Sequence, residues 1–174
     1  MRFETYLDRI SERTVGRYDA FALFDDPQVF ENVIADFVSP FRDSDVDAVV
    51  GIDAIGFVLG TAVALELNVG FLPIRKGGKL PIPPEDRRRE QVTDYTGTQK
   101  TLEIDAARVS PGTRVLVVDD WMETAAQMDA ATTLVEAAGG RVVGIAVLDA
   151  GENDRTRTLD RKYHLHTVNP ETTF

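Results

Sequence analysis

The sequence has no cysteine and only two histidines among its 174 residues. The absence of cysteine excludes disulfide bonds, thiolate metal sites and a cysteine nucleophile. His164 and His166 lie two positions apart, so they would share one face of a strand, but no third metal ligand accompanies them in that segment. We therefore predict a structural role for both histidines rather than metal binding.

Long hydrophobic runs are also missing from the chain. No stretch approaches the roughly 20 consecutive apolar residues that a membrane-spanning helix needs. Acidic residues fall within the segment Met1–Asp8, where a secretory signal would carry an apolar run. These absences predict a cytoplasmic location and no membrane partner.

Positive charge is scarce. The chain has 19 lysines and arginines against 29 aspartates and glutamates, which gives a formal net charge of −10. An acidic surface disfavours binding to the phosphate backbone of nucleic acids, so no nucleic-acid partner is expected. Two basic clusters, Arg75–Lys79 and Arg87–Arg89, stand out against this background. The second is predicted to lie on a solvated face.

Patterns typical of buried strands and of helices alternate along the chain. They predict an α/β fold with a doubly wound parallel sheet, in which ligands bind at the carboxyl ends of the strands. The length suits a single domain over residues 1–174. The predicted strands cover residues 47–53, 70–74, 115–118, 141–149 and, at one edge, 163–168, and the predicted helices cover 55–67 and 128–138.

Three segments fall outside this alternation. Residues 1 to about 40 show the apolar spacing of amphipathic helices, the second of which starts at Asp26–Pro27. The segment from Leu80 to about Gln99 is polar and lacks the periodicity of a core element. Such a long excursion from a compact domain is usually a lid or a binding loop. Residues 151–157 are predicted to form a loop.

The most informative stretch runs from Val115 to Ala138. An aliphatic strand ends in Asp119-Asp120, and small and polar residues then lead into an alanine-rich helical segment. A helix N-terminus after a short loop attracts anions, because its first N–H groups are unpaired and its dipole favours negative charge. The loop can therefore hold a phosphate while the two acids bind hydroxyls. The alternative is an ordinary strand-to-helix loop without a ligand.

This stretch resembles the phosphoribosyl-pyrophosphate (PRPP) signature of the type I phosphoribosyltransferases. Most of the chain, about residues 16–150, is similar to the adenine-specific members of that family. The matching segments, in the family's order, are residues 49–57, 70–81, 94–95, 101–104 and 119–127. The resemblance implies the type I phosphoribosyltransferase fold, with an N-terminal helical hood over about residues 1–40 and a flexible hairpin lid over about residues 76–104.

The resemblance also implies an activity. The enzyme would transfer the 5-phosphoribosyl group from PRPP to a purine-type base, with adenine as the first expectation, and release pyrophosphate. Oxygen-bound Mg2+ would be the cofactor, held through substrate and water near Asp119 and Asp120 rather than by direct protein ligands. The implied partners are PRPP and a nucleobase or nucleotide, and the implied assembly is a homodimer.

The same resemblance assigns the site residues. The expected catalytic residues are Asp119 and Asp120, which would bind the ribose hydroxyls, with Asp94 and Tyr95 at the closing edge of the lid. The expected substrate-binding residues are Arg17 and Tyr18 in the base-contacting segment, Asp53 and Ala54 after the first strand, Arg75, Lys76 and Lys79 for pyrophosphate, and Glu123, Thr124, Ala125, Ala126 and Gln127 in the phosphate loop.

Some positions depart from the family pattern. Ile55 replaces an arginine that contacts pyrophosphate in the adenine enzymes, and Glu123 places a carboxylate in the phosphate loop. We expect phosphate to bind the backbone N–H groups of residues 124–127, with Glu123 facing solvent or a base. Two alternatives stay open: a nucleotide glycosidase or transferase with an unusual acceptor on the same scaffold, and a non-catalytic nucleotide sensor.

Overall fold

The structure is a computed structural model in which residues 3–14, 17–93, 97–172 and 174 are described. Its main sheet has seven strands in the order β11-β9-β7-β3-β4-β6-β5. The bounds are β3 Ala48–Ile52, β4 Gly70–Lys76, β5 Arg87–Thr93, β6 Gln99–Asp105, β7 Arg114–Val118, β9 Arg141–Val147 and β11 Leu165–Thr167. The five strands from β11 to β4 pair in parallel, and β6 joins β4 and β5 antiparallel.

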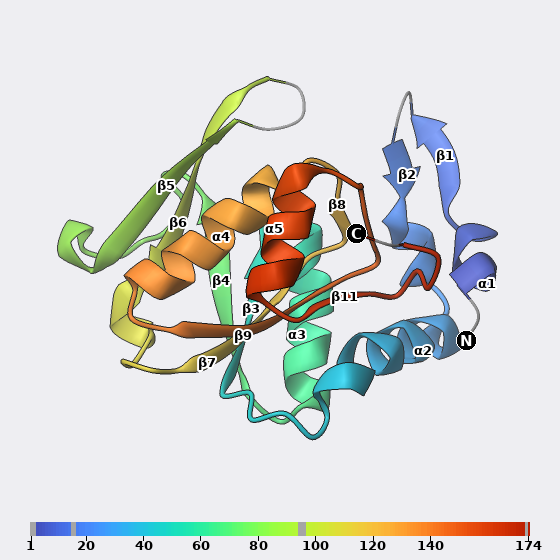
Figure 1. Cartoon of the computed structure of the whole chain (residues 1–174), viewed down its shortest axis with the longest axis horizontal. Helices are drawn as coiled ribbons and strands as arrows, with labels where there is room; N and C mark the ends of the chain where they lie inside the picture. Colours follow the sequence, from blue (N-terminus) through green and yellow to red (C-terminus); the bar gives the residue numbers. More distant parts are fainter. Residues whose placement is uncertain (1–2, 15–16, 94–96, 173) are drawn as a thin grey trace.

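Helices cover both faces of the parallel part of the sheet, as the strand–helix alternation predicted. In Figure 1, α4 (Ala126–Ala137) and α5 (Asp154–Lys162) lie in front of the sheet, and α3 (Ile55–Glu66) lies behind it. The face of the sheet opposite α4 and α5 also packs against α2 (Pro27–Val38). The central strands β3 and β7 are buried on both faces, which explains their nearly continuous aliphatic sequences.

The N-terminal segment contains a hairpin that the helical pattern did not predict. After α1 (Phe3–Leu7), β1 (Ser11–Thr14) pairs antiparallel with β2 (Arg17–Asp19), and the short helix η1 (Ala20–Leu23) leads to α2. The two amphipathic helices predicted within residues 1 to about 40 correspond to α1 and α2, and the hairpin lies in the connection between them. The first run of apolar helical spacing ends at Ile10.

The start of α2 follows the sequence prediction. The Asp26 side chain accepts hydrogen bonds from the N–H groups of Gln28 and Val29, and Pro27 occupies the first turn. These contacts satisfy two of the helix's unpaired donors. The short helix η2 (Ser39–Phe41) follows α2.

The polar excursion forms an ordered hairpin in its described part. The short helix η3 (Pro84–Asp86) precedes β5, and η4 (Ala106–Arg108) follows β6. Val92, Leu102 and Ile104 lie on one face of the β5–β6 hairpin and are buried in the core cluster that contains α4. The hairpin and the β1–β2 hairpin rise on opposite sides of the molecule, with the short strand β8 (Trp121–Met122) between them (Figure 1).

The C-terminal part differs from the prediction at one place. The segment 151–157, predicted as a loop, contains the start of α5, whose N-cap residue Asn153 accepts hydrogen bonds from the N–H groups of Arg155 and Thr156. The predicted edge strand is confirmed as β11. None of the helices in the described ranges combines the length and hydrophobicity of a membrane span.

Candidate active site

The two acids predicted to be central lie at the carboxyl end of β7. Asp119 donates its N–H to the carbonyl of Ala146 on β9, and its Oδ1 accepts the N–H of Asp120 at 3.0 Å. Burial, and then the neighbouring Asp120 carboxylate, raise the pKa of Asp119 well above its usual 3.8, while Lys76 acts in the opposite direction. The Asp119 carboxylate therefore lies in an environment that disfavours its charge unless cations or hydroxyl donors approach.

The N-terminal end of α3 packs closely against these acids. A Cβ atom added to Gly56 would lie 2.8 Å from Oδ1 of Asp119, and one added to Gly51 would lie 2.1 Å from the carbonyl oxygen of Gly56. Glycine at both positions thus lets the backbone of α3 reach β3 and the end of β7.

The predicted phosphate loop connects β8 to α4. Met122 and Ala125 are buried in the core, and Glu123 and Thr124 are exposed. Ala125 has a φ of 58°, a left-handed conformation that costs an alanine about 1–2 kcal/mol. The turn at Ala125 directs the chain into α4, and the loop therefore ends at a helix N-terminus suited to an anion.

The predicted pyrophosphate-binding residues form an ionic cluster beside β3 and β4. Arg75 Nε lies 3.3 Å and Lys79 Nζ 3.6 Å from Oδ2 of Asp53. The Arg75 guanidinium also lies over the Phe57 ring, 5.8 Å from its centroid. The peptide bond between Asp53 and Ala54 is cis. The cluster brings two cations to the carboxyl edge of the sheet, where an anionic substrate would compete with Asp53 for them.

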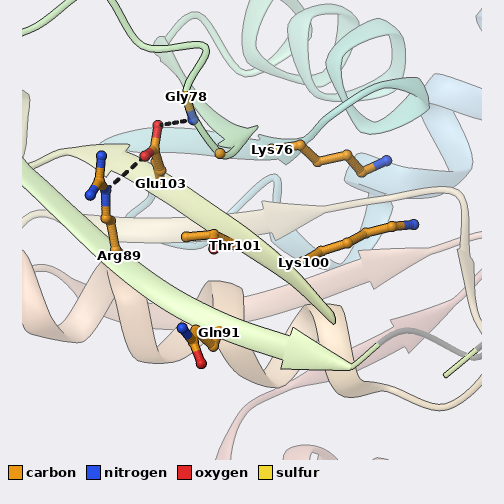
Figure 2. Close-up of a pocket in the computed structure, with 8 residues that line it drawn as sticks. Lys76, Gly78, Arg89, Gln91, Lys100, Thr101 and Glu103 are labelled. Atoms are coloured by element: carbon orange, nitrogen blue, oxygen red, sulfur yellow. Dashed lines mark hydrogen bonds and ion pairs between the residues drawn. The ribbon is translucent and has the colours of Figure 1, made fainter. Parts of the chain in front are cut away.

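A polar hollow of about 740 Å³ adjoins this cluster at the base of the β5–β6 hairpin (Figure 2). Lys76 on β4 and Lys100 on β6 extend in the same direction from their strands (Figure 2). On the other side of the hollow, the buried Glu103 accepts the N–H of Gly78 at 3.0 Å and Arg89 Nε at 2.8 Å. Glu103 thereby links the turn that carries Lys79 to the hairpin.

The second basic cluster is only partly solvated. Arg87 donates to the carbonyls of Leu80 and Ile82, and its Nη1 lies 3.9 Å from the buried Glu103. The prediction of a solvated face is thus wrong for Arg87, whose side chain is 16% exposed, and holds for the exposed Arg88. The alternation of a strand, which the sequence did not reveal here, turns successive arginines to opposite faces.

The two histidines lie in or directly next to β11. His166 Nε2 lies 3.0 Å from the carbonyl oxygen of Asp36, and both imidazole rings lie against Phe41. Within the described ranges, no group of three or more histidine or acidic side chains is arranged to hold a metal ion.

The geometry agrees with what comparison to known proteins finds. A family model described as the phosphoribosyl transferase domain matches residues 22–173. The adenine phosphoribosyltransferase of Dinoroseobacter shibae is 39% identical over 153 residues, which are 86% of this chain and 83% of that protein. The corresponding protein of Paracidovorax citrulli is 43% identical over 137 residues, 77% of this chain and 72% of that protein. The chain belongs to the phosphoribosyl transferase domain family.

Solved structures of this family share the fold. The adenine phosphoribosyltransferase of Thermoanaerobacter pseudethanolicus superposes with a TM-score of 0.85 at 29% identity, covering 95% of this chain and 98% of that one. The Giardia lamblia protein, complexed with 9-deazaadenine, gives a TM-score of 0.85 at 28% identity, with 97% of each chain covered. The predicted resemblance to the phosphoribosyltransferase family and the predicted α/β fold class are confirmed.

Not every predicted site residue of this phosphoribosyltransferase can be placed. Asp94 and Tyr95 lie outside the described residues. Arg17 and Tyr18 belong to β2 in the N-terminal hairpin, and their side chains are not described. Ala126 and Gln127 form the first turn of α4, next to the phosphate loop. The structure thus brings together the acids, the phosphate loop and the ionic cluster, all at the carboxyl edge of the sheet.

Sequence reasoning missed residues that contact the phosphate loop from α5. Asn153 and Arg155 donate hydrogen bonds to the carbonyl oxygens of Glu123 and Thr124. A signal was present in the sequence: Asn153 is a favourable N-cap residue, and the buried Thr156, Leu159 and Tyr163 follow at helical spacing.

Proposed function

We propose that this protein is an adenine phosphoribosyltransferase, which forms adenosine 5-monophosphate (AMP) and pyrophosphate from adenine and PRPP. The observation that carries the proposal is the arrangement of Asp119 and Asp120 between a helix N-terminus and a cationic turn. This arrangement offers separate places to a phosphate, two ribose hydroxyls and a pyrophosphate. The identity to adenine phosphoribosyltransferases over most of the chain supports adenine as the acceptor.

The reaction follows from the charges at this edge of the sheet. A base nitrogen forms a bond to C1 of the ribose while the bond from C1 to the pyrophosphate oxygen breaks, so positive charge develops on the sugar and negative charge on the leaving group. Asp119 and Asp120 lie where they would hold the sugar hydroxyls and stabilise the cationic sugar. Lys76, Arg75 and Lys79 would neutralise the departing pyrophosphate.

The site near Asp119 and Asp120 suits a magnesium ion that enters bound to PRPP. Mg2+ keeps several of its waters and commonly binds phosphate and hydroxyl oxygens of a substrate. Asp119 and Asp120 would hold the ribose hydroxyls and water that bind the ion, and the ion would neutralise charge on the pyrophosphate. The raised pKa of Asp119 is in accord with a site that is completed by a cation.

We also propose that the β5–β6 hairpin closes over bound substrate as a lid, and that residues 1 to about 40 form the hood over the base, both within one domain. The contact of Glu103 with Gly78 supports the first proposal, because it connects the hairpin to the cationic turn. Closure would exclude water from the cationic sugar and prevent its hydrolysis.

We propose a cytoplasmic homodimer as the working form. The apolar helix α3 supports the dimer, because Leu65 is 78% and Val58 39% exposed on it. Exposed apolar side chains of this size are common where protein surfaces associate. The cysteine-free composition is in accord with a reducing compartment.

An assay with labelled PRPP and a panel of bases tests the activity. We expect labelled AMP and pyrophosphate with adenine, and little product with hypoxanthine, guanine or uracil. Release of ribose 5-phosphate from AMP without added pyrophosphate would instead identify a glycosidase. Binding of AMP without turnover of any base would identify a sensor.

A further inference from the structure

Two side chains at the start of α5 bond the backbone of the phosphate loop. Asn153 Nδ2 donates to the carbonyl oxygen of Glu123 at 3.1 Å, and Arg155 Nη1 donates to that of Thr124 at 3.0 Å. Residues 123 and 124 lie about 30 positions before them in the chain, at the other end of α4 and β9. The contacts therefore join two loops that only the folded sheet brings together.

These bonds fix the direction of the loop's N–H groups. In a planar trans peptide the C=O and the next N–H point in opposite directions. Carbonyls held toward α5 thus direct the N–H groups of Thr124 and Ala125 away from α5, on the side where the loop would receive an anion. A donor on a carbonyl oxygen also polarises its peptide group and strengthens the N–H on the far side.

The loop and its surroundings are strongly acidic in sequence. Residues 119–129 include Asp119, Asp120, Glu123 and Asp129 and no lysine or arginine. A phosphate dianion bound there would gain only from backbone dipoles and would be repelled by these carboxylates. The structure brings the cation Arg155 to the loop, and Arg155 Nε lies 3.7 Å from Oδ2 of Asp129 on α4.

The start of α5 is itself firmly anchored. The N–H of Gly151 bonds the carbonyl oxygen of Met122 at 2.9 Å, and a Cβ on Gly151 would lie 2.5 Å from the carbonyl oxygen of Glu123. Thr156, which is fully buried, donates its hydroxyl to the carbonyl of Gly151. Strand β10 (Asp149–Ala150) also pairs in parallel with β8, directly before the loop.

We propose that Asn153 and Arg155 are positioning residues for the 5-phosphate of the substrate: they orient the loop's N–H donors, and Arg155 offsets the charge of Asp129. The inference rests on the proposed function for the identity of the ligand.

The variant Arg155→Gln tests the charge, with Arg157→Gln as the matched control. Arg157 lies on the same helix, and its ion pairs are to Glu152 and Asp154. We expect Arg155→Gln to raise the KM for PRPP about tenfold and to weaken AMP binding equally, because one charge-assisted contact is removed. The affinity for adenosine, which lacks the phosphate, and the KM for adenine should each change less than twofold. The melting temperature should stay the same. The control should match the wild type throughout.

Three further variants separate positioning from a merely structural role. Arg155→Lys keeps the charge and should recover part of the AMP affinity. Adding Asp129→Asn to Arg155→Gln should also recover affinity, because the carboxylate left without its ion-pair partner is gone. Gly151→Ala displaces the loop and should weaken AMP more than adenosine.

The inference is overturned if Arg155→Gln binds AMP as tightly as the wild type, or loses AMP and adenosine affinity equally. Because these are binding measurements, they remain decisive if the wild-type protein fails to convert adenine and PRPP. That failure would contradict the proposed activity, and the comparison of AMP with adenosine binding would still test the role of Asn153 and Arg155.

Discussion

Gly56 and Asp119 are in contact so close that a single methyl group cannot fit between them. A Cβ on Gly56 would lie 2.8 Å from Asp119 Oδ1 and 3.0 Å from the carbonyl oxygen of Val118. Neither the backbone of β7 nor the enclosed carboxylate can move away easily. The position of the acid at the centre of the site thus depends on a glycine more than 60 residues earlier in the chain.

The first prediction concerns this contact. Gly56→Ala should displace Asp119 and lower kcat/KM for PRPP at least about 100-fold, an effect comparable with loss of an electrostatic catalytic group. Gly70→Ala is the matched control, because its Cβ would meet no atom within 4 Å. Steady-state kinetics of both variants check the prediction, and equal activity in the two would contradict it.

The second prediction concerns the acids themselves. Asp119→Asn and Asp120→Asn should each abolish measurable PRPP binding in calorimetry, because an amide binds the ribose hydroxyls and an associated cation poorly. The fold should survive, since both residues follow the strand rather than form its core. Asp160→Asn, which alters an exposed acid on α5, should bind PRPP normally. Wild-type affinity in the double variant at 119 and 120 would remove the central claim.

The third prediction is a pH dependence of stability. The pKa of Asp119 is higher in the folded protein than its usual 3.8, so between these two values the folded state holds more protons than the unfolded state. The contribution of Asp119 to the free energy of unfolding must then fall as the pH rises from 3.8 to the raised pKa. Asp119→Asn should therefore become progressively more stable than the wild type from pH 4 upward. Denaturant unfolding at several pH values measures the difference, and a constant or shrinking difference would contradict the sign.

The fourth prediction concerns the lid. Hydrogen exchange near the outer end of the hairpin, at Thr93 and Gln99, should slow when PRPP binds. Exchange at Leu102 and Ile104 should change little, because these residues are already buried against the core, and they provide an internal control. Equal exchange at the outer end with and without PRPP would contradict closure.

The fifth prediction concerns the dimer. Leu65→Glu should convert the protein to a monomer in sedimentation velocity, because it introduces a charge into the proposed apolar contact. Leu7→Glu alters another exposed leucine, on α1, and should leave the assembly unchanged. A wild-type protein that sediments as a monomer would end the proposal.

The parallel sheet could be predicted because its strands carry their own signal. Val115–Val118 and Ala48–Ile52 are aliphatic throughout, since both faces are covered. Helix α5 could not be recognised in the same way, because only Thr156 and Leu159 of its nine residues are buried. A polar helix with so narrow an apolar stripe resembles a loop in sequence.

Candidate site residues form a local sequence pattern only where they are contiguous. The acids and the phosphate loop follow one strand, so a local pattern contains them. The pairing of Arg75 and Lys79 with Asp53, and that of Glu103 with Gly78, joins residues 22 or more positions apart. Their register depends on how β3, β4 and β6 pair, which is a tertiary property.

The strand order has a consequence for how the protein folds. Asp47, directly before β3, and Arg114, the first residue of β7, are 67 positions apart. Arg114 bonds the Asp47 carboxylate through three nitrogens and lowers the pKa of Asp47 to about 2. The central pair therefore closes a long loop, which is slow in comparison with local contacts. During synthesis β3 and β4 emerge well before β7, so the edge of β3 that pairs with β7 stays unpaired until β7 is made. We expect the nascent chain to depend on chaperones until β7 is available, and the site to form only in that late step.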